Sequence, residues 1–174
     1  MLLIQLTGLS GSGKTTLANG VQHWLGRQDR RLEVIDGDAY RSRPGWNLGF
    51  SKEDRCENIR RLGAAAHAYV LQGIPAIISA INPYASVRAE LRARYGAVTV
   101  YVSCALPVLV DRDTKGLYRR AMLPAGHPER VDGFTGVSDP YEVPGDADLV
   151  LHTDLEVPGE SIEKLGVYVL SLLG

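Results

Sequence analysis

A glycine-rich stretch near the start of the chain has the residue types and the spacing that bind phosphate groups. Residues 8–15 read GLSGSGKT, which matches GxxxxGK followed by Ser or Thr. Glycines let the backbone curl with its N–H groups pointing inward, and the start of a following helix adds partial positive charge. Lys14 can reach the outer phosphates, and the Thr15 hydroxyl can coordinate the magnesium ion that bridges them. The stretch therefore predicts a phosphate-binding loop, or P-loop, for a nucleoside triphosphate with Mg²⁺.

The elements on either side of this loop decide whether the match is meaningful. A short apolar strand is predicted over residues 2–6, and a helix is predicted from Lys14 to Gly26. A glycine-rich turn without a ligand is the alternative, but a strand before the motif and a helix after it are the context in which it binds phosphate. The residues that we expect to contact the nucleotide are Gly8, Ser10, Gly11, Ser12, Gly13, Lys14, Thr15 and Thr16.

Two aspartates follow a second predicted strand at residues 31–35. Asp36 and Asp38 are separated by one glycine. An acid beside the phosphates can hold magnesium through water or take a proton from an attacking hydroxyl. The alternative is a turn in which both carboxylates cap backbone N–H groups. Beside a P-loop we favour the catalytic interpretation, with Asp38 as the base and Asp36 as a supporting residue.

A long helix is predicted from Ser51, which can cap it, to residue 72, and one of its faces begins with two polar residues. Positions 55, 58, 59, 62, 66 and 69 share this face at helical spacing. All are apolar or aromatic except Arg55 and Asn58. Polar residues at the start of an otherwise buried helix face suggest a cleft, in which these residues bind an acceptor substrate. The alternative is that Arg55 forms a surface ion pair with a carboxylate at the start of the helix.

The only two phenylalanines of the chain lie in segments that are predicted to be loops. Phe50 ends residues 39–50, which are too rich in Gly and Pro for a helix and which also contain Arg41. Phe134 lies in residues 123–145, which show no helical period and are expected to be a long mobile covering segment. Rings placed in loops, with arginines nearby, indicate stacking on a planar anionic ligand. Packing of each loop onto the body is the alternative.

The predicted elements alternate between strand and helix. Further strands are expected at 74–80, 98–103 and 149–152, and further helices at 85–95, 107–120 and 161–173. Apolar strands in repeated strand–helix units predict an α/β fold, with a five-stranded parallel sheet covered by helices on both faces. Ligands of such sheets gather at the carboxyl ends of the strands. The P-loop, residues 36–38 and residues 80–83 would all open there.

The bulk properties indicate one soluble domain with no macromolecular partner of strong opposite charge. The chain has 174 residues and a formal charge of −1, which gives no electrostatic reason to expect nucleic acid or an acidic membrane as partner. No apolar run is long enough to span a membrane. Cys56 and Cys104 lie far apart and have no partner at metal-ligand or CxxC spacing. We therefore expect a single cytoplasmic domain, residues 1–174.

The absence of two sequence motifs reduces the number of reaction types that the P-loop can serve. The sequence contains no NKxD motif for guanine, and neither the third nor the fourth predicted strand ends in the aspartate–glutamate pair of a motor or transport ATPase. A covering segment together with an acceptor pocket suits a kinase, which must exclude water from the phosphoryl group that it transfers.

Six segments, in order, resemble adenylylsulfate kinases. They are GLSGSGKTT at 8–16, DGDAYR at 36–41, LGFSKEDRCENIRR at 48–61, AINPYASVR at 80–88, VDRDTKGLYRRA at 110–121 and GFTGVSDPYE at 133–142. The resemblance implies transfer of the γ-phosphate of ATP to the 3′-hydroxyl of adenosine 5′-phosphosulfate. It also implies the P-loop NTPase fold, Mg²⁺, a mobile lid at about residues 115–145 and a homodimer.

The resemblance also assigns roles to single residues. Asp38 becomes the base near the 3′-hydroxyl, with Lys14 and Asp36 as the other catalytic residues. Phe50 and Phe134 become the rings that sandwich the acceptor's adenine. The implied acceptor-binding positions are Asp38, Arg41, Phe50, Arg55, Asn58, Ile81, Asn82, Lys115 and Phe134, and Arg112 is implied to lie near the adenine of ATP.

Several places depart from the family pattern. Asn82 stands where the family usually has serine, and Asp132 stands where a lysine usually precedes GFTG. Residues 44–47 read PGWN, and residues 122–131 form a longer and less basic segment than usual. Because of these departures, a second hypothesis is a related kinase, or sibling kinase, that phosphorylates a different hydroxyl. A nucleotide-binding module without turnover is a third hypothesis.

Overall fold

A five-stranded, all-parallel sheet organises the chain, and a computed structural model describes residues 1–174. The strand order is β2-β3-β1-β4-β5. The strands are β1 (Leu3–Thr7), β2 (Glu33–Asp36), β3 (Ala76–Ser79), β4 (Val98–Ser103) and β5 (Leu149–His152). The helices are α1 (Lys14–Gly26), α2 (Gly37–Arg41), α3 (Lys52–Val70), α4 (Ala85–Tyr95), α5 (Leu106–Arg112), α6 (Leu117–Ala121) and α7 (Pro158–Leu173). The α/β class, the five strands and their parallel order confirm the prediction.

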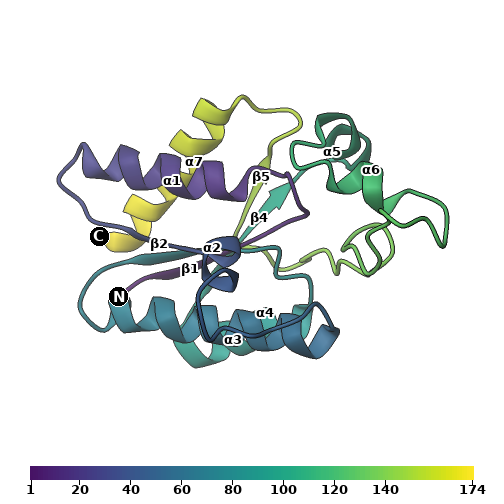
Figure 1. Ribbon diagram of the computed structural model, residues 1–174. Helices are drawn as coiled ribbons and strands as arrows, with labels where there is room; N and C mark the ends of the chain where they lie inside the picture. The colour runs from purple at the N-terminus through teal and green to yellow at the C-terminus, as the bar shows by residue number, and fades with distance from the viewer.

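One face of the sheet packs against α1 and α7, which lie side by side in Figure 1. Side chains alternate between the faces of a strand, so Ile4 and Leu6 of β1 point to the same side. They belong to one buried cluster with Leu17 and Val21 of α1 and with Leu165 of α7. This layer holds the first turn of α1, and with it the P-loop, against the end of β1.

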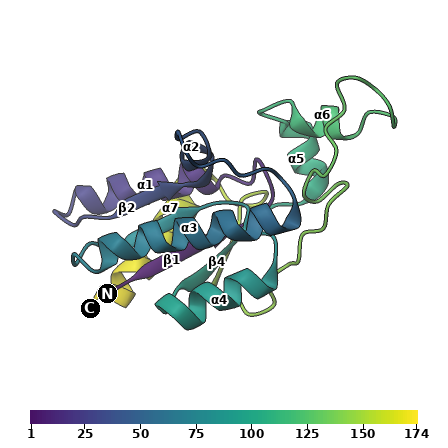
Figure 2. The ribbon, with the colours of Figure 1, turned by 60° about the horizontal axis from the view of Figure 1, so that its bottom comes forward.

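The opposite face packs against α3 and α4 (Figure 2). Leu3 of β1 belongs to a second buried cluster with Ile59 and Leu62 of α3 and with Leu91 of α4. The predicted apolar stripe of the long helix is therefore its buried face. Ser51 caps this helix as expected, because its Oγ accepts a hydrogen bond from the Asp54 amide at 3.0 Å.

Several boundaries differ from the prediction by a few residues. β2 begins at Glu33 instead of residue 31, and β3 covers Ala76–Ser79 instead of 74–80, because the flanking apolar residues lie outside the hydrogen-bonded ladder. The last helix begins at Pro158, three residues earlier than expected. Proline is favoured in the first turn of a helix, and the Glu160 carboxylate accepts the Val157 amide at 3.1 Å.

The single helix predicted over residues 107–120 is wrong, because the chain forms two shorter helices, α5 and α6. Between them Asp113 and Gly116 adopt positive φ angles of 20° and 64°, which an α-helix does not allow. The Asp113 carboxylate accepts the amides of Tyr118 and Arg119 at 2.9 and 3.0 Å, and so caps the second helix. The Asp113 side chain therefore ends the first helix and starts a second one, although the apolar periodicity on either side is compatible with a single helix.

The prediction that residues 39–50 contain no helix is also wrong at their beginning. Residues Gly37–Arg41 form α2, a helix of five residues. Asp36 supplies its N-cap, since Oδ1 accepts the amides of Asp38 and Ala39 at 3.0 Å each. Helix formation stops before Pro44 and Gly45, where the predicted irregular structure begins.

An irregular segment covers residues 122–148 and extends from one side of the body with α5 and α6 (Figures 1 and 2). Its only pairing is an isolated bridge between Thr135 and Asp139. The prediction of a long segment without helical period is confirmed. None of the helices combines the length and apolar character needed to cross a membrane.

Candidate active site

The loop between β1 and α1 has the backbone conformation that its glycines were expected to permit. Gly11 and Gly13 have φ angles of 76° and 96°, in the left-handed region that favours glycine. A Cβ on Gly8 would collide with the carbonyl oxygen of Val102 in β4. Gly13 immediately precedes α1, so the loop runs directly into the positive end of a helix dipole.

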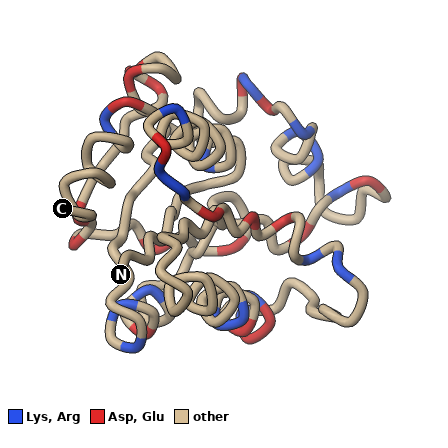
Figure 3. The backbone as a smooth tube through the Cα atoms, turned by 90° about the vertical axis from the view of Figure 1, so that its left-hand side faces the viewer, with Lys and Arg blue, Asp and Glu red and all other residues tan.

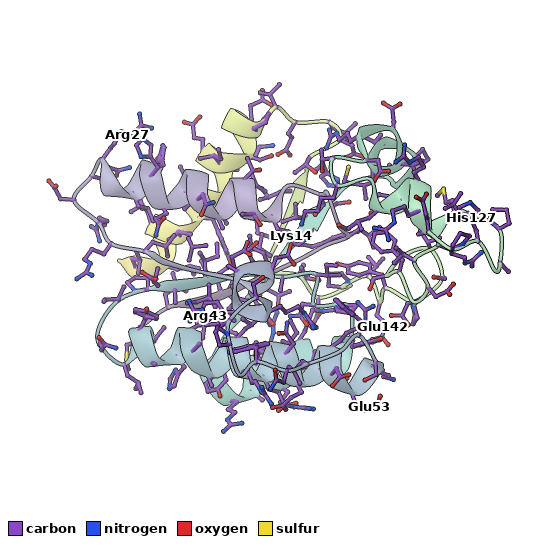
Figure 4. All side chains as sticks on the ribbon, in the orientation of Figure 1. Lys14, Arg27, Arg43, Glu53, His127 and Glu142 are labelled. Carbon is purple, nitrogen blue, oxygen red and sulfur yellow. The ribbon has the colours of Figure 1, made fainter.

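Lys14 is buried at the centre of the molecule, where Figure 4 labels it. Its Nζ donates to the carbonyl of Leu9 at 2.7 Å and to Ser12 Oγ at 3.4 Å. Burial lowers the pKa of this lysine to about 7, although the nearby carboxylate of Asp38 acts in the opposite direction. The ammonium group is therefore held in a place that favours its charge only when an anion is beside it.

Three oxygen-bearing side chains meet beside the P-loop. Thr15 Oγ1 donates to Asp36 Oδ2 at 2.7 Å and lies 3.1 Å from Ser79 Oγ at the end of β3. Hydroxyl and carboxylate oxygens are the ligands that Mg²⁺ prefers, and the ion usually keeps several waters. This donor set fits a magnesium site at the edge of the phosphate loop. Ser79 was not predicted from the sequence to be a site residue. It could have been found, because Ser79 ends the strand that pairs with β1, and ligands gather at the ends of parallel strands.

Asp36 and Asp38 differ in their contacts, and this difference distinguishes capping of backbone N–H groups from a role in the cavity. Asp36 caps α2 with one carboxylate oxygen and contacts Thr15 with the other, so the capping alternative is right for this residue. The Asp38 carboxylate caps nothing and is 76% exposed. It accepts a hydrogen bond from Lys115 Nζ at 2.6 Å, across the space between α2 and the turn before α6. Asp38 therefore faces the cavity with a cationic partner.

A cavity of about 510 Å³ joins the P-loop to the irregular segment. Of the residues predicted to form the site, those that line it are Ser10, Gly11, Gly13, Lys14, Thr15, Thr16, Asp36, Asp38, Phe50, Arg55, Ile81, Lys115 and Phe134. Lining residues that the sequence did not indicate include Ser79, Thr114, Leu117 and Thr135. The lining of the cavity thus includes both the phosphate-binding groups and the two phenyl rings.

Four further predicted residues do not line the cavity. Asn58 is 4% exposed, and its Oδ1 accepts the indole N–H of Trp46 at 2.7 Å. Arg41 donates to the carbonyl of Gly49 at 2.8 Å, and its guanidinium lies 4.8 Å from the centre of the Phe50 ring. These two residues support the loop that carries Phe50. Ser12 is fully buried, and Gly8 packs against β4.

Asn82 and Arg112 occupy two further positions outside this cavity. Asn82 is 1% exposed with a φ of 47°, and its amide donates to Gln5 Oε1 at 2.9 Å. Asparagine tolerates the left-handed region better than most residues, so its place in this buried turn has a backbone reason. Arg112 donates to the carbonyl of Thr153 at 2.8 Å, on the other side of the P-loop.

The two phenyl rings differ in their surroundings. Phe50 is 69% exposed and projects from its loop. Phe134 is 8% exposed and packs edge to face against Tyr118 of α6, with ring centroids 5.0 Å apart. The alternative of packing onto neighbouring elements therefore describes part of the Phe134 environment. Both rings still line the same cavity.

Arg55 does not form the surface ion pair considered for it. Its side chain is 11% exposed and lies 3.8 Å from Asp139 of the irregular segment, not beside a carboxylate in its own first turn. It also donates to Thr135 Oγ1 at 2.9 Å and to the carbonyl of Gly133 at 2.6 Å. The guanidinium therefore connects α3 to the segment that carries Phe134.

Comparisons with known proteins agree on one family. A family model described as adenylylsulphate kinase matches residues 1–152. An adenylyl-sulfate kinase of Gloeothece citriformis is 45% identical over 172 residues, which cover 98% of this chain and 94% of that protein. A probable adenylyl-sulfate kinase of Synechocystis is 44% identical over 163 residues, covering 93% of this chain and 89% of that protein. Among solved structures, the APS kinase CysC of Mycobacterium tuberculosis in complex with AMPPNP and APS matches with a TM-score of 0.84 at 34% identity, over 96% of each chain.

Proposed function

The chain belongs to the adenylylsulphate kinase family, and we propose that it transfers the γ-phosphate of ATP to the 3′-hydroxyl of adenosine 5′-phosphosulfate (APS). The product is 3′-phosphoadenosine 5′-phosphosulfate. The observation that carries this conclusion is the single cavity that joins the P-loop to Asp38 and to the rings of Phe50 and Phe134. A donor phosphate and a nucleoside acceptor held in one cavity can react without a bimolecular encounter.

On the donor side, the P-loop amides and Lys14 bind the phosphates of ATP. Thr15 and Asp36 would hold Mg²⁺, with Ser79 beside them, and the ion supplies neutralisation of phosphate charge. Lys14 adds a second positive charge in a buried place, where electrostatic interactions are stronger than in water. These groups act on the charge that is shared among the γ-phosphate oxygens during transfer.

On the acceptor side, Asp38 receives the proton of the 3′-hydroxyl. As the hydroxyl oxygen bonds to the γ-phosphorus, the bond from that phosphorus to the bridging oxygen of ADP breaks. Phe50 and Phe134 stack on the adenine of APS and orient its ribose toward Asp38. A turn of the Lys115 ammonium from Asp38 toward the phosphates would free the carboxylate to act as the base.

The proposed function is tested by measuring ADP formation with ATP, Mg²⁺ and APS. Acceptor-dependent turnover well above an APS-free control supports it. Turnover at the level of the APS-free control, from protein that still binds ATP, contradicts it and favours a kinase for another hydroxyl. The sibling-kinase alternative has one specific observation behind it, namely an acidic residue in the cavity wall. Asp132 is 82% exposed and its only ionic partner is Arg130, two residues away.

Replacing Asp132 with lysine is expected to lower the KM for APS about fivefold. The substitution exchanges a negative for a positive charge beside an anionic substrate, and interactions at such an exposed place amount to roughly 1 kcal/mol. Steady-state kinetics at saturating MgATP measure the effect, which should weaken as salt is added. Glu163→Lys is the matched control, because it makes the same charge change at an exposed position of α7. An unchanged KM in Asp132→Lys would contradict a role for this charge in acceptor binding.

Binding of ATP at pH 8 is expected to take up nearly one proton. The pKa of Lys14 in the ligand-free protein is about 7, so the amine is mostly neutral at pH 8. Phosphates beside Nζ favour the charged form. Calorimetric titrations in two buffers with different ionisation enthalpies should therefore give different binding enthalpies at pH 8. At pH 6 the difference should disappear, because Lys14 already carries its proton. Equal enthalpies at pH 8 would contradict the expectation.

Three further proposals concern the surroundings of the enzyme. Both cysteines are free, which is compatible with a reducing cytoplasm. Lys and Arg alternate with Asp and Glu along the backbone in Figure 3, and the net charge is −1, which gives no electrostatic reason to propose a nucleic acid as partner. A homodimer is supported by exposed apolar side chains at the end of the chain, among them Leu155, Val157 and Val167.

A further inference from the structure

One arginine side chain connects the two parts of the cavity wall that carry phenyl rings. Arg55 Nε donates to the carbonyl of Phe50 at 2.8 Å. Its Nη1 donates to Thr135 Oγ1 at 2.9 Å, and its Nη2 donates to the carbonyl of Gly133 at 2.6 Å. The guanidinium therefore binds Phe50 itself and both chain neighbours of Phe134.

We propose that Arg55 is a positioning residue that sets the separation between Phe50 and Phe134, and thereby the width of the slot for the adenine of APS. A guanidinium is planar and presents its donors in fixed directions, so three simultaneous bonds leave the two walls little freedom to move apart. This inference rests on the proposed function, because it takes the adenine of APS as the occupant of the slot.

Residues 134–139, which carry the Phe134 ring, are held together by hydrogen bonds of their own. The carbonyl of Phe134 accepts the amides of Ser138 and Asp139 at 3.0 and 3.1 Å, and the Phe134 amide donates to Ser138 Oγ at 3.0 Å. Asp139 is held in turn by the Tyr84 hydroxyl at 3.1 Å. Residues 134–139 therefore form one tight turn, and a bond that fixes Thr135 also fixes the ring of Phe134.

Direct contact between Arg55 and the anionic end of APS is a separate role that the same guanidinium can perform. Three of its five N–H groups are used in the bonds above, and the side chain lines the cavity. Substitution of Arg55 would remove both roles at once. Thr135 separates them, because it is 1% exposed and its hydroxyl is an acceptor for Arg55.

The test compares Thr135→Val with Thr135→Ser. Valine keeps the shape of threonine and removes the acceptor, whereas serine keeps the hydroxyl and loses a methyl group. We expect Thr135→Val to raise the KM for APS roughly 10- to 150-fold, as loss of a hydrogen bond to a charged group does. The KM for ATP should stay within about twofold in both variants, and Thr135→Ser should remain close to wild type for APS.

If Thr135 served only to pack the turn, the order would be reversed, and Thr135→Ser would have the higher KM for APS. A wild-type KM for APS in Thr135→Val, or an equal loss in Thr135→Ser, would overturn the proposal.

Amide hydrogen exchange of the ligand-free protein tests the connection without substrate. In Thr135→Val the amides of residues 134–139 should exchange about tenfold faster than in wild type or Thr135→Ser, while those of α7 remain unchanged. Unchanged exchange at 134–139 would overturn the positioning role even if the enzyme turns over APS. Absence of APS-dependent turnover in the wild type would instead overturn the proposed function, and the exchange rates would still decide the role of Arg55.

Discussion

Replacing Asp38 with asparagine is expected to lower kcat about 10³-fold, with the KM for ATP nearly unchanged. An amide has the shape of the carboxylate but cannot accept the proton of the 3′-hydroxyl, and a positioned general base contributes roughly 10² to 10⁴ in rate. The carboxylate makes no capping bond and is 76% exposed, so the substitution leaves the fold intact. Acceptor-dependent ADP formation over a range of ATP and APS concentrations measures the effect.

The matched control for this prediction is Asp36→Asn, which changes the neighbouring carboxylate in the same way. Asparagine can still cap α2 with its amide oxygen, but it cannot offer the second carboxylate oxygen that accepts from Thr15, so this variant should hold Mg²⁺ more weakly and raise the KM for MgATP. Asp38→Asn should do neither. A kcat for Asp38→Asn within tenfold of wild type would contradict a role as base, because a transfer that needs no proton acceptor would tolerate the amide.

Features that depend on a few neighbouring residues were predictable from the sequence. The P-loop could be recognised because its glycines, its lysine and its flanking strand and helix follow one another within residues 2–26. The cap at Ser51 depends on a residue three positions away. The parallel sheet followed from the alternation of apolar strands and helices, and it placed the strand ends at one edge without any knowledge of contacts.

Features that depend on competing local interactions were predicted less well. The apolar pattern of residues 107–120 is compatible with one helix, but Asp113 caps a new one and stops the old one. Residues 37–41 begin with Gly37 and Asp38, which have low helix propensity, and Asp36 satisfies two of the free amides at the start of this helix. In both places a single aspartate outweighs the pattern that surrounds it.

Contacts between residues far apart in the sequence could not be predicted. Arg55 could be placed at the mouth of a cleft from its helical position, but its partners Gly133 and Thr135 lie in a segment without periodicity. The burial of Asn82 follows from Gln5 on a neighbouring strand and from a positive φ angle, neither of which the sequence displays. Tertiary structure alone supplies these contacts.

Replacing Lys14 with methionine is expected to lower kcat/KM for transfer roughly 10²- to 10³-fold while leaving the ligand-free protein as stable as wild type or more stable. The lost ammonium is a buried positive charge aimed at the phosphates, and removal of one such electrostatic group typically costs 10² to 10³ in rate. The same burial disfavours the charge when no anion is bound, as the pKa of about 7 indicates. Methionine fills a similar volume without this penalty. Transfer assays and thermal unfolding of the same preparations measure both effects.

The stability difference between the two proteins should depend on pH in a defined direction. The pKa of Lys14 is about 7 in the folded state and 10.5 in the unfolded chain, so between these values the unfolded state binds more protons. Wild-type stability therefore gains up to about 1.4 kcal/mol per pH unit from this group as the pH rises from 7 toward 10.5. The advantage of Lys14→Met should be largest at and below pH 7 and should shrink as the pH increases. A variant less stable than wild type by the same amount at every pH would show that Lys14 serves the fold as well as the phosphates, and would contradict the assignment of its burial to function alone.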